Sequence, residues 1–520
     1  MLSAASVVVL AAGLGAYGLA ALRWLRVAQR EHYLAGSVLR FAARWWSLSW
    51  WQPALLLLGW AFALGALAWL LFGLLGAVVA GAGPVGLSLR GRTSRLAFTR
   101  RLRTLAGATG LLGAGGVTLC GLRWDWRGAA VAAVLLGLAA PAVVDLALAL
   151  LAPVESRVAA RYVDRASRRL AEIHPVVLAI TGSYGKTTTK GYAAELLAGR
   201  FQVLASPRSY NNQAGLARTV NELLVAGTDV LVAEMGTYGP GELAHLCSWL
   251  TPTVSVITAI GPVHLERFGS LEKILEAKAE ITTPARASVL NVDDPLLASL
   301  AERLECEGRR VVRCSGSRPE TEVAVVQGAD GVHVHVGGED LGVVALAGNS
   351  ATIALSNVAC AFGAAIELGC SAAELLGRLG SLPVAENRLQ VRSATSGAAI
   401  LDDTFNSNPA GTRLALGALA AIPAKRRIVV TPGMVELGTM QAAENEAFGA
   451  AAGQVATDVV VVGRTNRRAL LAGLRSVRQG GAPVVVHLVS HREQASEFVR
   501  ANLGGEDAVL YENDLPDHFP

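Results

Sequence analysis

The hydrophobic and polar positions divide this chain into an apolar first third and a remainder of mixed pattern. Residues 1–22 carry no charge, and residues 45–89 form an unbroken uncharged run. About 20 apolar residues cross a ~30 Å hydrocarbon core, so the second run predicts two helices joined by a turn near 71–76. Residues 104–122 and 128–153 predict further helices, separated by Arg-Trp-Asp-Trp-Arg. The pattern therefore predicts an N-terminal α-helical membrane domain of about five spans.

The arginine-rich segments indicate which side of the membrane each loop faces. They lie at 23–44, 90–103 and 157–169, each next to an apolar run. Basic loops concentrate on the cytoplasmic side of membrane proteins, and five spans place all three segments on one face, whereas four spans divide them. We therefore expect a multi-pass protein of the cell membrane, in contact with the lipid bilayer, whose C-terminal body lies in the cytoplasm. A cleaved signal peptide at 1–22 is the alternative, but that stretch has no basic n-region.

Charge and cysteine content exclude other classes of protein. The net charge of +5 comes with arginines that flank apolar runs, so membrane topology explains it and we expect no nucleic-acid partner. The six cysteines show no C-x-x-C spacing, which indicates reduced core residues rather than a zinc site or a disulfide framework. Asp145 lies within the last predicted span, where a carboxylate is either functional or paired with a neighbouring helix.

A phosphate-binding loop follows the membrane domain. Val176–Thr181 is an apolar, largely β-branched run, 182–186 is a glycine loop, and 187–197 has a helical pattern. In this strand–loop–helix order, backbone N–H groups face a phosphate and Lys186 neutralises its charge. The hydroxyl of Thr187 can bind Mg²⁺. The sequence therefore predicts a nucleotide site.

Two further residues follow apolar strands and therefore belong to the same edge of a parallel sheet. Glu234 ends the run 229–233, and His264 follows the run 254–260. Sites in α/β proteins form at the carboxyl ends of the strands, so both residues are candidates for a functional site there. A plain strand-end carboxylate and an ordinary loop histidine are the alternatives.

The sequence T-G-S-Y-G-K-T-T at 181–188 resembles the ATP loop of the Mur ligase family, the ATP-dependent amide ligases of peptidoglycan assembly. Seven further stretches resemble the family in the same order. They are NNQAG (211–215), VAEMGTYGPGEL (232–243), GPVHLERFGSLEKILEAKAEI (261–281), SNVACA (356–361), ENRLQV (386–391), LDDTFNSNPAG (401–411) and PGMVELG (432–438). These stretches are most similar to the branch that adds D-alanyl-D-alanine to a UDP-N-acetylmuramoyl-tripeptide.

The apolar pattern and the resemblance together predict the division of the chain. We expect a transmembrane domain at 1–154, a central ATP-binding phosphate-loop α/β domain at 155–392, and a Rossmann-like α/β domain at 393–520. The α/β pattern restarts at residue 394, and strands are expected near 398–402, 428–432, 458–462 and 484–488.

The resemblance also implies ATP and Mg²⁺ as cofactors, with two metal ions. The ATP-binding residues would be Gly182, Ser183, Tyr184, Gly185, Lys186, Thr187, Thr188, Asn357, Arg388 and Asp403. Of these, Asn357 would read the adenine, and Arg388 and Asp403 would contact the phosphates and the ribose. The metal ligands would be Thr187, Glu234, His264 and Lys278, with Lys186, His264 and Lys278 in catalytic roles. In several members the counterpart of Lys278 is carbamylated; a solvated helix lysine is the alternative. Asn211 and Asn212 would belong to the substrate-side loop.

The implied reaction transfers the γ-phosphoryl group of ATP to a carboxylate, and an amino acid or dipeptide amine attacks the acyl phosphate. Two departures leave the substrates open. Membrane spans replace the family's UDP-binding N-terminal domain, so the muramoyl-peptide is either nucleotide-linked or lipid-linked. The ending AVLYENDLPDHFP lacks the family's lysine-glycine-serine-arginine sequence. The alternatives are a membrane-anchored ligase of the poly-γ-glutamate or folate type and a non-catalytic nucleotide-sensing membrane partner.

Overall fold

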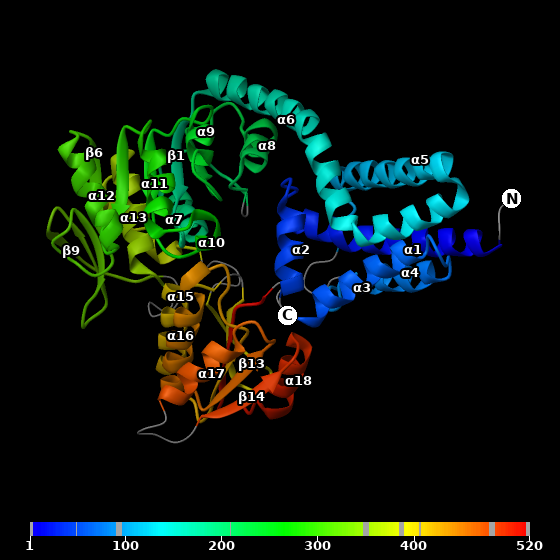
Figure 1. The fold of residues 1–520 in the computed structure, drawn as a ribbon. Coiled ribbons are helices and arrows are strands. Elements are labelled where there is room, and N and C mark those ends of the chain that lie inside the picture. The colour runs from blue at the N-terminus through cyan, green and yellow to red at the C-terminus, as the bar shows by residue number, and fades with distance from the viewer. Residues whose placement is uncertain are drawn as a thin grey trace. The chain divides into compact units, whose positions relative to one another are not determined.

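The computed structural model contains two compact units, one of residues 1–160 and one of residues 161–514, and each is described by itself (Figure 1). The structure describes residues 4–47, 49–89, 96–207, 210–346, 353–383, 389–404, 407–477 and 484–515.

The first unit is helical. Its helices are α1 (Ala4–Arg30), α2 (Ser37–Ser47), α3 (Trp51–Gly65), α4 (Phe72–Ala82), α5 (Arg100–Leu138) and the first part of α6 (Ala140–Ile173). α1 packs along α5, and Tyr17 lies so close to Gly113 that any side chain at Gly113 would overlap the tyrosine ring. The Tyr17 hydroxyl donates a hydrogen bond to the Thr109 carbonyl at 2.6 Å. A small residue on one helix therefore admits a large one from its neighbour, as in closely packed membrane helices.

The expected count of five spans is not confirmed. Among the described residues, α1 and α5 are long and apolar enough to cross a membrane, and the bent pair α2–α3 would make a third crossing if it is one span. α3 and α4 are about 22 Å and about 16 Å long at 1.5 Å per residue, shorter than a ~30 Å core. The turn between them lies at 66–71 rather than 71–76. The predicted break before residue 128 is confirmed, because Trp124 and Asp125 have non-helical backbone angles inside α5.

Asp145 is paired with a neighbouring helix. One carboxylate oxygen accepts hydrogen bonds from the backbone N–H groups of Gly36 (3.0 Å) and Val38 (3.4 Å), and the other accepts from Leu39 (2.8 Å). The residue is 5% exposed. The first N–H groups of a helix have no partner within the helix, and a carboxylate at that end satisfies them and complements the helix dipole. Asp145 therefore caps α2, and the helix-paired alternative explains it.

The second unit begins with a nine-stranded sheet in the order β2-β3-β1-β4-β5-β6-β7-β8-β9. Every pair in this order from β2 to β7 is parallel, whereas the pairs β7–β8 and β8–β9 are antiparallel. The strands are β1 (Val176–Thr181), β2 (Val203–Ala205), β3 (Val230–Glu234), β4 (Val254–Ile257), β5 (Ala287–Asn291), β6 (Arg310–Ser315), β7 (Val323–Gln327), β8 (Val332–Val336) and β9 (Glu339–Val344).

Helices cover both faces of this sheet (Figure 1). α7 (Lys186–Leu197) and α13 (Leu355–Glu367) pack on the face that carries Leu178 and Ile180. The opposite face is covered by α8 (Gln213–Leu223), α9 (Glu242–Cys247), α12 (Pro295–Cys306) and the end of α6. The short helices α10 (Leu265–Phe268), α11 (Leu271–Ala279) and α14 (Ala372–Leu376) complete this part of the unit. Two buried faces explain why the parallel strands are almost continuously apolar.

The second sheet has the order β10-β11-β15-β12-β13-β14, with β10 antiparallel to β11 and the other strands parallel. Its strands are β10 (Gln390–Ser393), β11 (Ala399–Asp403), β12 (Arg427–Thr431), β13 (Asp458–Val462), β14 (Val485–Val489) and β15 (Ala508–Glu512). Its helices are α15 (Pro409–Ala421), α16 (Gln441–Val455), α17 (Arg467–Ser476) and α18 (Arg492–Asn502). The four expected strands are confirmed to within a residue or so, and β10 and β15 are additional.

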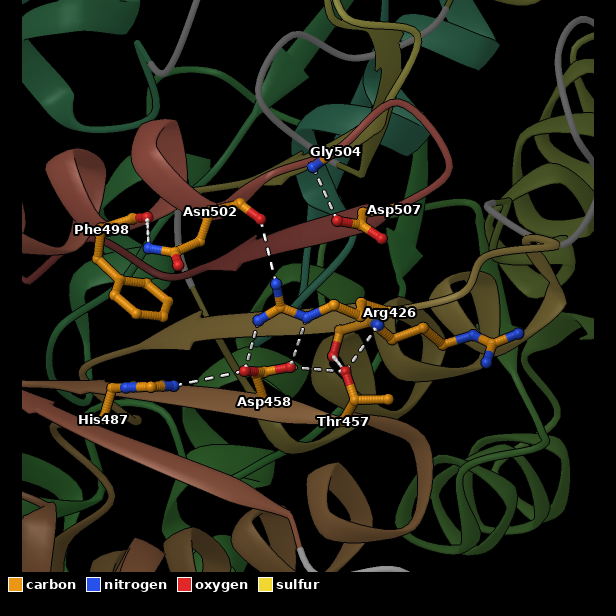
Figure 2. A network of polar contacts seen from close by, with 9 residues as sticks. Arg426, Thr457, Asp458, His487, Phe498, Asn502, Gly504 and Asp507 are labelled. Atoms are coloured by element: carbon orange, nitrogen blue, oxygen red, sulfur yellow. Dashed lines mark hydrogen bonds and ion pairs between the residues drawn. The ribbon is translucent and has the colours of Figure 1, made fainter.

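A polar network closes the amino edge of this second sheet (Figure 2). Arg426 donates to both carboxylate oxygens of Asp458, at 2.7 and 3.2 Å, and to the carbonyl of Asn502 at 3.1 Å. Burial alone would raise the pKa of Asp458, but hydrogen bonds from Arg426, Thr457 and His487 outweigh it and lower that pKa. The bidentate pair satisfies both charges and joins the starts of β12 and β13, and the third hydrogen bond of Arg426 adds the end of α18.

We predict that Asp145→Ala lowers the free energy of unfolding of the first unit by about 1–2 kcal/mol, the usual cost of losing a helix cap. Asp145→Asn keeps one accepting oxygen and should cost less. Thermal unfolding of the full-length protein in detergent, followed by circular dichroism, measures both variants. Equal losses for alanine and asparagine would contradict the capping role.

Candidate nucleotide site

The phosphate loop connects β1 to α7 and is fixed by contacts with the segment after β4. Gly185 has φ 78°, and a Cβ there would overlap the side-chain oxygen of Asn357. The Ser183 N–H donates to the Ala259 carbonyl at 2.7 Å, and its hydroxyl bonds both the N–H and the carbonyl of Gly261, at 3.0 and 3.1 Å. Ser183 thus shapes the loop rather than presenting its side chain. The loop N–H groups and the N-terminus of α7 form an anion site.

Tyr184 and Lys186 fold back on the loop. The Tyr184 ring lies against Gly261, where any Cβ would overlap it, and burial raises the pKa of its phenol. Its hydroxyl oxygen has no hydrogen-bond partner among the described residues. The Lys186 ammonium donates to the Gly182 carbonyl at 2.7 Å and to the Ser183 carbonyl at 3.4 Å. Thr187 and Thr188 follow in the first turn of α7, both half-buried.

Glu234 lies at the end of β3, next to the phosphate loop. It pairs in register with Ile180 of β1, and strand alternation directs its side chain to the face covered by α7. The residue is 1% exposed, and its carboxylate lies 3.2 Å from the ammonium of Lys190. Its second oxygen accepts from the Asn211 side-chain amide at 3.0 Å. The sequence analysis missed Lys190, although it stands one helical turn after Lys186 on the same side of α7.

The two asparagines of the substrate-side loop have different positions. Asn211 bonds Glu234, and its backbone carbonyl accepts from the Gly236 N–H at 2.7 Å. The Asn212 side chain accepts from the Gly215 N–H at 2.9 Å and is the N-cap of α8. Asn211 therefore belongs to the edge that carries Glu234, whereas the Asn212 side chain stabilises a helix start.

His264 and Lys278 both lie in the part of the chain between β4 and β5. His264 has φ 59°, and its Nδ1 lies 2.6 Å from a carboxylate oxygen of Glu436, a residue that sequence analysis did not single out. Its ring lies 4.9 Å from the ring of Tyr238. Lys278, near the end of α11, is 5% exposed. Burial and then the nearby charge of Lys186 hold the pKa of Lys278 well below its ordinary value.

The remaining candidates come from later segments. Asn357 stands at the start of α13 and packs against Gly185 of the phosphate loop. Arg388 lies outside the described residues. Asp403 ends β11, and one of its carboxylate oxygens accepts from the Leu389 N–H at 3.1 Å.

Asp403 has an acidic neighbour close to the C-terminus. It pairs in register with Glu512, the last residue of β15, which is fully buried and accepts from the Ser407 hydroxyl at 2.7 Å. Burial first, and the charge of Asp403 second, raise the pKa of Glu512 well above its ordinary value. Two adjacent carboxyl groups in a dry environment share one proton.

This pair predicts a pH dependence. Glu512 binds its proton more tightly in the folded state, so its contribution to stability is complete below the ordinary pKa of 4.5 and is lost as pH rises above it. Glu512→Gln mimics the protonated form. We predict that the melting temperature of the parent falls relative to the variant between about pH 5 and about pH 8. A difference between the two proteins that is constant with pH would contradict the shared proton.

Comparison with known proteins agrees with this geometry. The Mur ligase middle domain matches residues 180–365, and the Mur ligase glutamate ligase domain matches residues 387–511. The UDP-N-acetylmuramoyl-tripeptide–D-alanyl-D-alanine ligase of Mycobacterium tuberculosis is 31% identical over 361 residues, which are 64% of this chain and 69% of that protein.

Solved structures share the fold. MurF ligase from Thermotoga maritima in complex with ADP is 26% identical, with a TM-score of 0.57 over 68% of this chain and 80% of that one. MurF from Acinetobacter baumannii, at 21% identity, has a TM-score of 0.59 over 68% and 77%. With both domains and more than two thirds of a relative matched, the chain belongs to the Mur ligase family of ATP-dependent ligases.

Proposed function

We propose that the chain joins D-alanyl-D-alanine, or a similar amine, to a muramoyl-peptide in peptidoglycan assembly, with formation of ADP and phosphate. The observation that carries the proposal is the phosphate loop with the buried carboxylate of Glu234 beside it on the neighbouring strand. The matched relative is named for this reaction, and the Thermotoga structure binds ADP. A ligase of the poly-γ-glutamate or folate type would use the same ATP residues with other substrates.

In this proposal the loop from Gly182 to Thr188 holds the phosphates of ATP. Lys186, whose ammonium already lies over the loop, neutralises charge as the γ-phosphoryl group passes to the substrate carboxylate. The acyl phosphate then reacts with the amine, the amide bond forms and phosphate leaves. Asn357 would meet the adenine, and Arg388 and Asp403 would contact the phosphates and the ribose.

The residues fit a Mg²⁺ site. Glu234 is a buried carboxylate that already faces a cation, so positive charge is accommodated at its position. The hydroxyl of Thr187 and the ring of His264 are suitable additional ligands, and Mg²⁺ when bound neutralises the charge of the transferred phosphoryl group. Lys278 joins this set only if it is carbamylated. Its lowered pKa favours the neutral amine, which is the form that reacts with CO₂.

The proposal also includes a membrane domain at 1–154, followed by an ATP-binding domain at 155–392 and a C-terminal domain at 393–520. The two later domains lie in the cytoplasm, and the acyl substrate is linked to a lipid. Two long apolar helices in the first unit support a membrane location. The five-span topology is kept as a hypothesis, supported by the break in α5 at Trp124 and Asp125. Cysteine labelling tests it: a cysteine at Asp125 should react from outside the cell, and one at Ser317 only after permeabilisation.

We predict that Lys186→Ala and Glu234→Ala each lower amide formation by about 100-fold or more, the scale of losing one group that stabilises developing charge. The assay follows ADP release and product mass with D-alanyl-D-alanine and either a nucleotide-linked or a lipid-linked muramoyl-tripeptide. Lys425→Ala is a matched control, because that lysine pairs with exposed Glu506. Near-normal turnover in either site variant would refute the site. Equal use of both acyl substrates would refute the lipid-linked preference.

Carbamylation of Lys278 predicts a dependence on CO₂. Removal of dissolved CO₂ and bicarbonate should lower the rate of the parent protein several-fold, and added bicarbonate should restore it. Lys278→Ala should be slow in both conditions and indifferent to bicarbonate. A parent rate that is independent of bicarbonate, with mass spectrometry of the native protein showing an unmodified lysine, would exclude the carbamate.

A further inference from the structure

Lys190 and Glu234 form a buried ion pair in the middle of the candidate site. The lysine side chain is 7% exposed and the glutamate side chain 1% exposed, with 3.2 Å between the ammonium and one carboxylate oxygen. Lys190 stands on α7 one turn beyond Lys186, and Glu234 ends β3. None of the sequence motifs accounts for this second lysine.

The other side of the carboxylate is held from a different segment. Asn211 donates its side-chain amide to the second carboxylate oxygen at 3.0 Å. Its own backbone carbonyl accepts from Gly236, and a side chain at Gly236 would press on the Asn211 amide. Asn211 is thus fixed to the end of β3 at two points, and it fixes one oxygen of Glu234 in turn.

A buried carboxylate needs a counter-charge, because the loss of its hydration is not otherwise repaid. At a metal site this requirement conflicts with function, since the oxygen that faces the counter-charge is also the oxygen that a metal ion needs. An ammonium group and a divalent cation at the same carboxylate oxygen repel each other strongly at low dielectric. The cation that stabilises the metal-free protein therefore weakens the binding of the metal.

We propose that Lys190 is a positioning residue that occupies the metal side of Glu234 and gives up that oxygen when a divalent cation binds. Asn211 keeps the second oxygen in place during the exchange, so the carboxylate does not turn away. The inference rests on the proposed role of Glu234 as a metal ligand. In this inference Lys190 stabilises Glu234 in the metal-free protein, whereas Lys186 has the proposed role of neutralising the phosphates of ATP.

The test uses the full-length protein in detergent with ADP and Mn²⁺, whose free concentration is read by electron paramagnetic resonance. Lys190→Met keeps most of the length of the unbranched side chain and removes its charge. We expect Mn²⁺ to bind this variant more tightly by about tenfold, while its melting temperature without divalent cations falls. In a Glu234→Gln background, Lys190→Met should no longer change Mn²⁺ affinity. Lys425→Met, at an exposed ion pair, should change neither quantity.

The outcomes separate this inference from the proposed function. If Glu234→Gln weakens Mn²⁺ binding but Lys190→Met leaves it unchanged or weaker, the exchange is refuted and the metal site stands. If Glu234→Gln leaves Mn²⁺ affinity unchanged, the metal role of Glu234 is wrong and the inference falls with it. If the methionine variant does not fold, Lys190→Arg is the second test, because it keeps the charge. This variant should preserve metal-free stability and bind Mn²⁺ no more tightly than the parent. Tighter binding would contradict the proposal.

Discussion

The parallel register between β1 and its two neighbours holds the candidate site together. Ile180 of β1 lies opposite Glu234 on one side and Val256 on the other, so the phosphate loop, Glu234 and the segment leading to His264 start from one edge. A slip of one residue in β3 would turn Glu234 to the opposite face, away from α7. The apolar residues that enforce this register, Val230 and Val232, are buried under α7 and α13. Core packing therefore determines where the carboxylate points.

Charged residues are paired differently at the amino edge of the second sheet and at the proposed site. At the amino edge of the second sheet, Asp458 and Arg426 make a bidentate pair in which each charge is satisfied (Figure 2). Elsewhere, Lys278 is buried near Lys186, and Glu512 at the end of β15 is buried beside Asp403, so the two groups of each pair would repel each other if both were charged. Unfavourable groupings of this kind persist where a ligand or a proton compensates them. This contrast agrees with the proposed site at the carboxyl edges, whereas the satisfied pair at the amino edge has a structural role.

The sequence predicted local features and missed long-range ones. The phosphate loop, Glu234 at a strand end and the strands of the second sheet follow from patterns within a few residues of each other. Lys190 required knowledge of which face of α7 meets β3, and Glu512 required the pairing of β11 with β15, which lie more than a hundred positions apart. Asp145 was ambiguous because the N–H groups that it caps come from residues 36–39. The count of five spans is not confirmed, because hydropathy does not show where an apolar run ends one helix and begins another. The helix cap formed by Asn212 could be predicted from the sequence, since asparagine commonly precedes a helix.

The end of α6 packs against α8, the helix that begins at the substrate-side loop. From Arg161 onward this helix belongs to the α/β unit, with Val163 and Ala166 buried in its core. Asn221 of α8 donates to the Tyr162 carbonyl at 2.9 Å, and Arg169 donates to the Leu224 carbonyl at 2.8 Å. α8 in turn starts at Asn212, next to the asparagine that holds Glu234. The segment that leads out of the apolar helices is thus packed on the helix that begins at the substrate-side loop. A flexible segment at this point would leave α8 unsupported on that side, whereas the packed end of α6 restrains α8 and, through it, Asn212 and the neighbouring Asn211.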